Sequence, residues 1–148
     1  MAVIRNKGNY ISNDRFGLIQ ADIALVWYSI TSLYDFAWRS DIKAIEISNE
    51  THFKEISREG YITYFTVIIA EPFIKYSLFM DNDHFSGEWT GHFKQVENGT
   101  EIRFTESINL RKWWLYPFAW LYFRLQQKRY VTDLKRKCEQ KNRPISRF

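Results

Sequence analysis

The sequence predicts an α+β domain in which a curved antiparallel sheet of seven strands wraps round one long C-terminal helix. Between residues 42 and 110, apolar and polar side chains alternate with the period of two that a half-buried strand requires, and turn sequences such as SREG and ENGT interrupt the alternation. Residues 117–140 follow the helical period instead. A further alternating segment and two short helical segments precede the main run of strands.

The length and composition favour a single domain that is rich in aromatic side chains. The chain has 148 residues, the usual size of one domain, so we assign residues 1–148 to one domain with 1–13 as a flexible or accessory N-terminal extension. Phe, Trp and Tyr make up 18% of the sequence, within 45% hydrophobic and 26% charged residues. That much flat apolar surface suggests an aromatic-lined pocket, a contact surface, or both.

The N-terminal third is predicted to hold one strand and two short helices. Residues 14–20 form a short alternating segment that reads as a strand. Asp22 is a good helix N-cap, because apolar residues follow it at helical spacing: Ile23, Val26, Trp27 and Ile30. Thr31 or Ser32 can cap a second short helix that runs to about Ala37, and the WRSD segment then ends it.

Six strands and the long helix follow. The predicted strands span residues 42–48, 51–57, 61–70, 73–81, 85–96 and 101–110. Their connections are short, so they must form an antiparallel meander. Pro117 suits the first turn of the closing helix, which is expected to reach about Gln140.

The strand predicted over 85–96 has an unusual inner face. One side of it carries Phe85, Gly87, Trp89, Gly91 and Phe93, so large aromatic side chains alternate with glycines, which have no side chain. Glycine in a strand allows a bend and leaves room above the sheet. The pattern therefore predicts a curved sheet around an internal cavity, with a helix packed into the gap as the alternative.

Several motifs resemble the START-like (SRPBCC) superfamily, whose fold is called helix-grip. They are ADIALVWYSITSLYDFAWRSDI, the EP after the fourth strand, GEWTGHF, ENGTEIRFTE and QQKRYVTDLK, within about residues 14–140. The chain looks most similar to the polyketide cyclase/dehydrase and lipid-transport-like branch. The resemblance implies a hydrophobic cavity between the sheet and the long helix, which holds a lipid, a polyketide-like molecule or another apolar compound. It does not imply catalysis.

Four charged residues fall within the apolar pattern of the predicted sheet. Glu106 lies on an otherwise apolar strand face with Ile102, Phe104, Ile108 and Leu110. Buried carboxyl groups need partners or take up a proton, and Arg39 is the candidate counter-ion for Glu55, Glu71 and Glu106. We predict a polar cluster at the cavity, with three roles open: a structural ion-pair network, ligand anchoring, or general acid–base catalysis.

The predicted cavity lining combines these polar residues with the inward aromatic and aliphatic ones. Gln127 is the polar exception on the apolar face of the long helix, where its amide can bond a sheet carboxylate, a ligand or backbone carbonyls. The complete predicted set is Trp38, Arg39, Phe53, Glu55, Tyr61, Phe65, Val67, Glu71, Tyr76, Leu78, Trp89, Phe93, Phe104, Glu106, Trp120, Phe123 and Gln127.

Charge and a second apolar helix face suggest a further contact surface. From Arg111 to the C-terminus there are eleven Lys or Arg residues and two acids, a charge of +9 that leaves −5 on the preceding residues. Segment 113–125 has a second apolar face, which carries Phe118, Leu121, Tyr122 and Leu125. This face needs a partner, which can be a membrane surface, a homodimer or the cavity mouth. No nucleic-acid-binding motif accompanies the charge, so no nucleic-acid partner is expected.

Other classes of site and location find little support. The single Cys138 excludes an intrachain disulfide and a cysteine zinc site, and His52, His84 and His92 lie on separate segments, so no metal or cofactor is expected. Residues 1–13 lack the apolar core of a signal peptide, and the apolar run 113–123 is too short to span a bilayer. We therefore expect a cytoplasmic binding protein. A cyclase or dehydratase using Glu106 or Glu71, and a membrane-surface or partner-binding protein, are the alternatives.

Overall fold

A computed structural model describes residues 10–140 of the chain as a seven-stranded antiparallel sheet with two α-helices. The strand order is β1-β7-β6-β5-β4-β3-β2, so β2 to β7 form the predicted meander and β1 is added beside β7. The elements in chain order are β1 (Tyr10–Ile19), α1 (Ile23–Thr31), β2 (Ile42–Ile47), β3 (His52–Ser57), β4 (Ile62–Glu71), β5 (Lys75–Asp81), β6 (Phe85–Val96), β7 (Gly99–Leu110), η1 (Trp113–Leu115) and α2 (Tyr116–Glu139).

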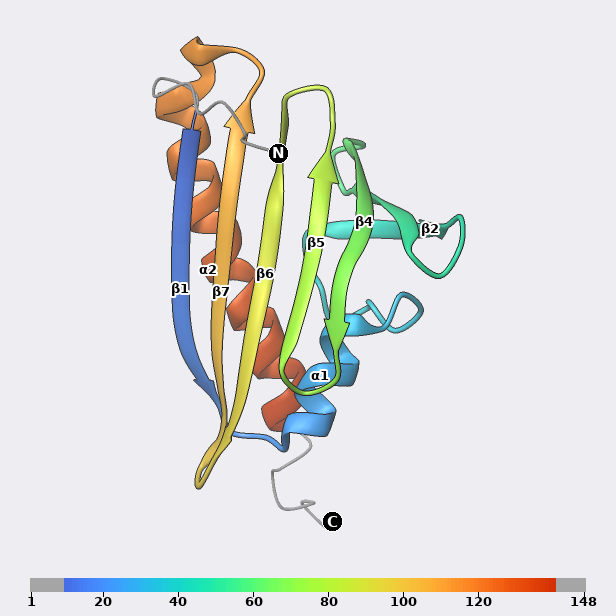
Figure 1. The fold of residues 1–148 in the computed structure, drawn as a ribbon, viewed down its shortest axis with the longest axis vertical. Coiled ribbons are helices and arrows are strands. Elements are labelled where there is room, and N and C mark those ends of the chain that lie inside the picture. Colours follow the sequence, from blue (N-terminus) through green and yellow to red (C-terminus); the bar gives the residue numbers. More distant parts are fainter. Residues whose placement is uncertain (1–9, 141–148) are drawn as a thin grey trace, which may run out of the picture.

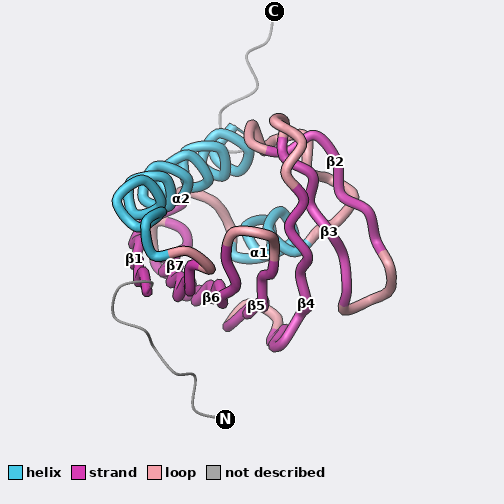
Figure 2. Tube along the Cα trace, turned by 90° about the horizontal axis from the view of Figure 1, so that it is seen from above, coloured by secondary structure: helices cyan, strands magenta, loops and turns pink. Residues whose placement is uncertain are grey.

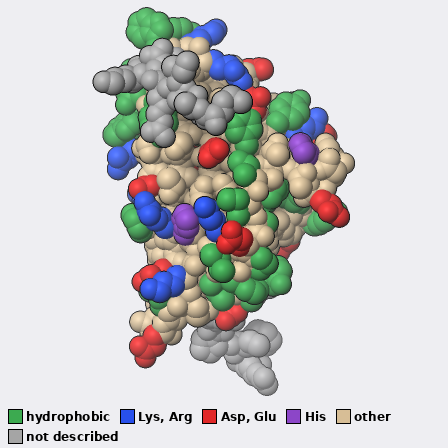
Figure 3. Space-filling view, viewed as in Figure 1, with side chains coloured by type: hydrophobic (Ala, Val, Ile, Leu, Met, Phe, Trp, Pro, Cys, Tyr) green, Lys and Arg blue, Asp and Glu red, His purple; other side chains and the backbone are tan. Residues whose placement is uncertain are grey.

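The sheet curves round α2 in the predicted manner. In Figure 1 α2 crosses diagonally behind β1, β7 and β6, and α1 lies across the lower end of the sheet. The view from above in Figure 2 shows the strands following a curve that brings both β1 and β2 towards α2. Figure 3 shows basic, acidic and histidine side chains among exposed hydrophobic ones on the outer face, and the buried core lies on the inner face.

The first strand is longer than predicted. β1 begins at Tyr10 and not at residue 14, so residues 10–13 of the predicted extension are part of the sheet, while residues 1–9 lie outside the described residues. The reason is the alternation at the start of the strand: Ile11 and Asn13 are buried, whereas Ser12 and Asp14 are exposed. Pairing with β7 continues along all ten residues of β1.

One helix, not two, connects β1 and β2. Asp22 caps α1 as predicted, because its carboxylate accepts a hydrogen bond from the Ala24 amide at 3.0 Å. The predicted helix from Thr31 or Ser32 to Ala37 is wrong. The Ser32 hydroxyl accepts hydrogen bonds from the amides of Tyr34 and Asp35, and this local turn replaces helical bonding.

Gly87 and Gly91 allow the bend in β6 in different ways. A Cβ atom on Gly87 would lie 2.2 Å from the Ser107 carbonyl oxygen of β7, so only glycine permits this approach of the two strands. Above Gly91 the space is not open: a Cβ would meet the Trp89 ring at 2.9 Å and the Phe93 ring at 3.2 Å. Gly87 therefore allows β7 to approach closely, and Gly91 leaves room for two aromatic rings. Neither glycine lines the cavity.

The long helix begins and ends close to the predicted residues. Pro117 is in the first turn of α2, and the basic Arg136 and Lys137 lie in its last turn, where cations interact favourably with the helix dipole. Phe123, Gln127 and Leu134 are buried against the sheet. No helix in residues 10–140 is both long and apolar enough to cross a membrane.

Candidate ligand-binding cavity

A cavity of about 670 Å³ lies between the inner face of the sheet and α2. Its size is in the range of small-molecule sites. Aromatic side chains from β3 to β7 and from α2 form much of its wall, and the segment between α1 and β2 contributes the rest. The core cluster around Trp27 fills the α1 end of the sheet and leaves this space open at the other end.

The structure brings thirteen of the seventeen predicted residues to this cavity, on the segments expected to surround it. Their ability to bind a ligand stays a prediction. They are Trp38, Arg39, Phe53, Glu55, Tyr61, Phe65, Tyr76, Leu78, Trp89, Phe104, Glu106, Phe123 and Gln127.

Two predicted residues of β4, Val67 and Glu71, lie outside the cavity, and a bulge between Val67 and Ile69 explains the position of Glu71. Before the bulge, Val67 pairs with the inward Leu78 and packs against the core without lining the cavity. After the bulge the sides exchange, so Glu71 lies on the outer face and is exposed. Glu71 is therefore removed from the predicted polar cluster.

Phe93 and Trp120 also lie outside the cavity. Phe93 is buried under α1, with its ring centroid 5.3 Å from that of Trp27. Trp120 is 41% exposed, and the guanidinium of Arg124 covers its ring at 4.9 Å. The first turns of α2 instead present Phe118, Ala119 and Tyr122 to the cavity, beside the predicted Phe123.

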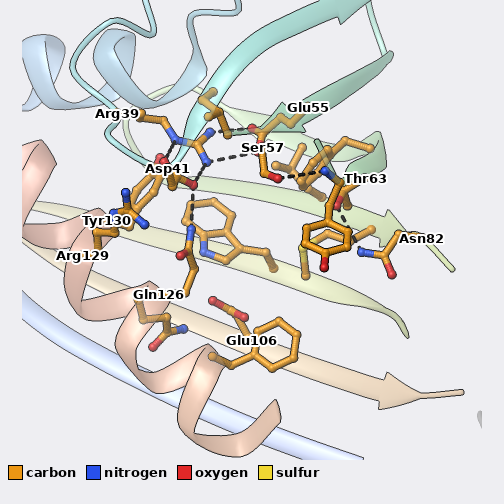
Figure 4. A pocket seen from close by; sticks show the side chains of 18 of the residues that line it. Arg39, Asp41, Glu55, Ser57, Thr63, Asn82, Glu106, Gln126, Arg129 and Tyr130 are labelled. Carbon is orange, nitrogen blue, oxygen red and sulfur yellow. Dashed lines mark hydrogen bonds and ion pairs between the residues drawn. The ribbon is translucent and has the colours of Figure 1, made fainter. Parts of the chain in front are cut away.

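Arg39 is the centre of a buried ion-pair network at one end of the cavity (Figure 4). Its guanidinium donates to Glu55 at 2.5 and 3.1 Å and to Asp41 at 2.7 and 3.1 Å, and its carbon lies 5.1 Å from the centre of the Tyr130 ring. Gln126 donates to Asp41 at 2.6 Å. The predicted pairing of Arg39 with Glu55 is confirmed, and Asp41 is the second carboxylate.

The electrostatics of this network follow from its burial. Burial by itself lowers the pKa of Arg39, but the attraction of Glu55 and Asp41 outweighs it and raises that pKa above its usual range. Burial raises the pKa of Asp41, and the nearby Arg39 outweighs that effect and lowers it. Arg39 and Asp41 are therefore charged at neutral pH, and the guanidinium of Arg39 directs its hydrogen bonds at Asp41 and Glu55.

Glu106 lies apart from that network. It is 7% exposed, and in Figure 4 its carboxyl points into the space between α2 and the sheet, away from Arg39. No ion pair to Glu106 is present in residues 10–140. Burial raises its pKa to about 7, and the adjacent Gln127 amide opposes this only in part. The predicted pairing of Glu106 with Arg39 is therefore wrong.

Sequence reasoning missed several polar residues of the cavity. Asp41 was not selected although it follows Arg39 by two residues in the WRSD segment, and this spacing was the available signal. Gln126 and Arg129 were outside the apolar stripe of α2, because they come from the helix edge that faces Ser40 and Asp41. Tyr130 of α2 also lines the cavity and was not in the predicted set. No group of side chains in residues 10–140 has the composition and spacing of a metal site.

Structural comparison identifies the fold. A START superfamily protein from Mycobacterium smegmatis is similar over 89% of this chain and 98% of its own, with a TM-score of 0.73 and 12% sequence identity. The chain has a START-like, helix-grip fold. A conserved protein from Geobacillus kaustophilus is similar over 86% of this chain and 94% of its own, with a TM-score of 0.75 and 12% identity.

A third similar structure is longer than this chain. It is a protein of the dynemicin biosynthetic locus, matched over 86% of this chain but 46% of its own, with a TM-score of 0.67 and 11% identity. No protein-family model and no curated protein matches the sequence. At such low identities the START-like structures establish the fold, and function has to be argued from the cavity.

Proposed function

We propose that the protein binds a small apolar ligand, such as a lipid or a polyketide-like molecule, for carriage or sensing. The observation that carries this proposal is the cavity of about 670 Å³ with its largely aromatic wall, which the protein's own side chains leave open. A void of this size costs stability when it is empty, and an apolar occupant recovers the lost contacts. The START-like fold supports the same function. The cytoplasmic location stays a prediction.

The cyclase or dehydratase alternative requires a group that exchanges a proton with the ligand. Glu106 meets one requirement, since a pKa of about 7 suits proton transfer near neutral pH. A catalytic carboxyl is normally oriented by partners, and no lysine, arginine or histidine forms an ion pair with it in the described chain. Binding without turnover is therefore the function that the cavity supports best.

Filling the cavity mouth is expected to abolish ligand binding. Ala119 lines the mouth on α2, so Ala119→Trp should lower the affinity for a neutral fluorescent dye such as Nile red by at least about tenfold. Lys135→Trp, on an exposed position of the same helix, is the matched control and should bind as the parent does. Native mass spectrometry of protein purified from cells should also show a bound small molecule that Ala119→Trp lacks. Absence of any saturable dye binding by the parent would refute the proposal.

A second candidate function, docking on a membrane surface, is favoured by an exposed patch beside the cavity mouth. We define the aromatic–basic patch as Trp113, Trp114, Phe118, Leu121, Tyr122 and Leu125 together with Arg111, Lys112 and Arg124. Its apolar members are 52–76% exposed. Exposed Trp and Tyr next to Lys and Arg are typical of proteins that lie on anionic membranes.

Charge favours a membrane over a second copy of the chain as the partner of this patch. Residues 111–132 contain five basic residues and no acidic one. Two such surfaces would repel in a symmetric dimer, whereas phosphate headgroups would neutralise them. Because Phe118 and Tyr122 also line the cavity, the patch would place the cavity mouth at the membrane.

The double variant Trp113→Ser, Trp114→Ser is expected to lose most binding to vesicles that contain phosphatidylglycerol. The parent should bind these vesicles more tightly than pure phosphatidylcholine, and the difference should shrink as salt is added. Tyr34→Ser removes an 85% exposed aromatic residue outside the patch and serves as the control. Equal binding by the double variant and the parent would contradict docking. A concentration-dependent dimer that the double variant lacks would assign the patch to self-association instead.

A further inference from the structure

Three polar side chains converge on the inner face near α2, well away from Arg39. Glu106 of β7 lies opposite Asn13 in the register of β1, and Gln127 of α2 lies close enough to the Glu106 carboxyl to affect its ionisation. All three are buried, at 7%, 8% and 4% exposure. Glu106 and Gln127 line the cavity, whereas Asn13 lies behind them.

Two amide nitrogens of this group make no hydrogen bond. Neither Nδ2 of Asn13 nor Nε2 of Gln127 makes a hydrogen bond of good geometry in residues 10–140, although the Gln127 amide is near enough to Glu106 to lower its pKa. Leaving a buried donor unsatisfied costs about 1–3 kcal/mol, and native proteins rarely tolerate it without a reason. The Gln127 nitrogen is at the cavity wall, so an acceptor atom on a ligand can satisfy it.

The charges around the cavity indicate which acceptor is suitable. Four carboxyl groups line it, those of Asp41, Glu55, Glu59 and Glu106, against the guanidinium groups of Arg39 and Arg129. Arg39 is already bonded to two of these carboxylates. Arg129 donates to the hydroxyl and the carbonyl oxygen of Ser40, both at 2.7 Å. Besides the tyrosines, the imidazole of His84 is the other ionisable group of the wall. Without Glu106, the formal charges of Asp41, Glu55 and Glu59 outnumber those of the two guanidinium groups, so a ligand carboxylate would be repelled.

We infer that the ligand of the proposed function is an apolar molecule with a neutral oxygen acceptor, such as a ketone, quinone or ester carbonyl, which Gln127 and Glu106 bind. The Gln127 amide donates to this oxygen, and the protonated Glu106 carboxyl can donate a second hydrogen bond. Fatty acids and other carboxylates are disfavoured by the surplus of acidic groups elsewhere in the wall. The remainder of the ligand lies against the aromatic wall, which includes Trp89 and Phe104.

The inference is tested by displacing Nile red with three probes of equal alkyl chain: methyl laurate, lauric acid and dodecane. At about pH 6, where a fatty-acid carboxyl is ionised, the parent should bind methyl laurate at least about tenfold more tightly than lauric acid. Gln127→Met should weaken methyl laurate by about 2–10-fold, the worth of one hydrogen bond, and leave dodecane unchanged. Gln140→Met is the matched control, since this glutamine is exposed at the C-terminal end of the same helix, outside the cavity, and its replacement should not alter the ester-to-alkane ratio.

The outcomes separate this inference from the proposed function. Lauric acid binding as tightly as methyl laurate, or an unchanged ester-to-alkane ratio in Gln127→Met, would overturn the inference while dodecane binding still supports an apolar cavity. Failure of all three probes to displace the dye would overturn both. If Gln127→Met does not fold, the comparison of acid and ester on the parent protein decides the inference alone.

Discussion

Glu106→Gln is expected to make the protein more stable than the parent above pH 7. Burial raises the pKa of Glu106 from 4.5 to about 7, so the native state holds a proton that the unfolded chain releases. The stabilisation from that proton is complete below the unfolded pKa of 4.5 and is lost as pH rises through 7. The shift corresponds to about 3 kcal/mol of stability that the parent loses as pH rises. Glutamine resembles the protonated acid and does not titrate, so the variant keeps this stability.

Chemical denaturation from pH 5 to 8 measures this effect. The two proteins should have similar free energies of unfolding near pH 5, and the variant should be the more stable by up to about 3 kcal/mol near pH 8. Glu101→Gln changes an exposed carboxyl on the same strand and should show no such divergence. A Gln variant that is less stable than the parent at every pH would mean that Glu106 has an ionic partner after all.

The sequence predicted the strand order and the inner faces well because burial imposes periodicity on a strand. In β7 the alternation from Ile102 to Leu110 places five buried residues on the inner face, and Glu106 was identified as an exception to that pattern. The positions of β6 and α2 followed in the same way from the glycine–aromatic alternation and from the helical period. Of the thirteen predicted residues that line the cavity, eleven lie on strands, on α2 or in the adjoining turn, whereas Trp38 and Arg39 come from the WRSD segment, which has no such period.

The features that the sequence did not predict depend on local geometry or on tertiary pairing. The bulge after Val67 reverses the direction of every later side chain in β4, and an apolar strand that continues on both sides of a bulge gives no sign of it. After Ser32 the chain can form either a helix or a turn in which the Ser32 hydroxyl accepts from backbone amides, and the sequence does not show which of the two forms. The spacing in WRSD indicated Asp41 as a partner of Arg39, but Glu55 and Glu106 are far from Arg39 in sequence, and only the fold decides which of these two lies near the guanidinium.

Arg39→Met is expected to cost about 3–5 kcal/mol of stability at neutral pH, because it leaves Asp41 and Glu55 as two buried carboxylates without a cation. Methionine keeps much of the apolar stem, so the loss is electrostatic. Arg103→Met is the control: its ion pair with Asp14 is half exposed and should contribute less than about 1 kcal/mol.

The pH dependence distinguishes this loss from a packing defect. In the parent, Arg39 lowers the pKa of Asp41 below 3.8 despite burial, so the stability from Asp41 is present above the unfolded pKa and lost as pH falls through the folded one. In Arg39→Met that contribution is absent, and burial then raises the pKa of Asp41, so protonation of Asp41 relieves its unpaired charge in acid. The difference between variant and parent, measured by urea denaturation, should therefore be largest near pH 7 and smaller near pH 4. An equal penalty at both pH values would show that Arg39 stabilises the fold through its packing and not through its charge.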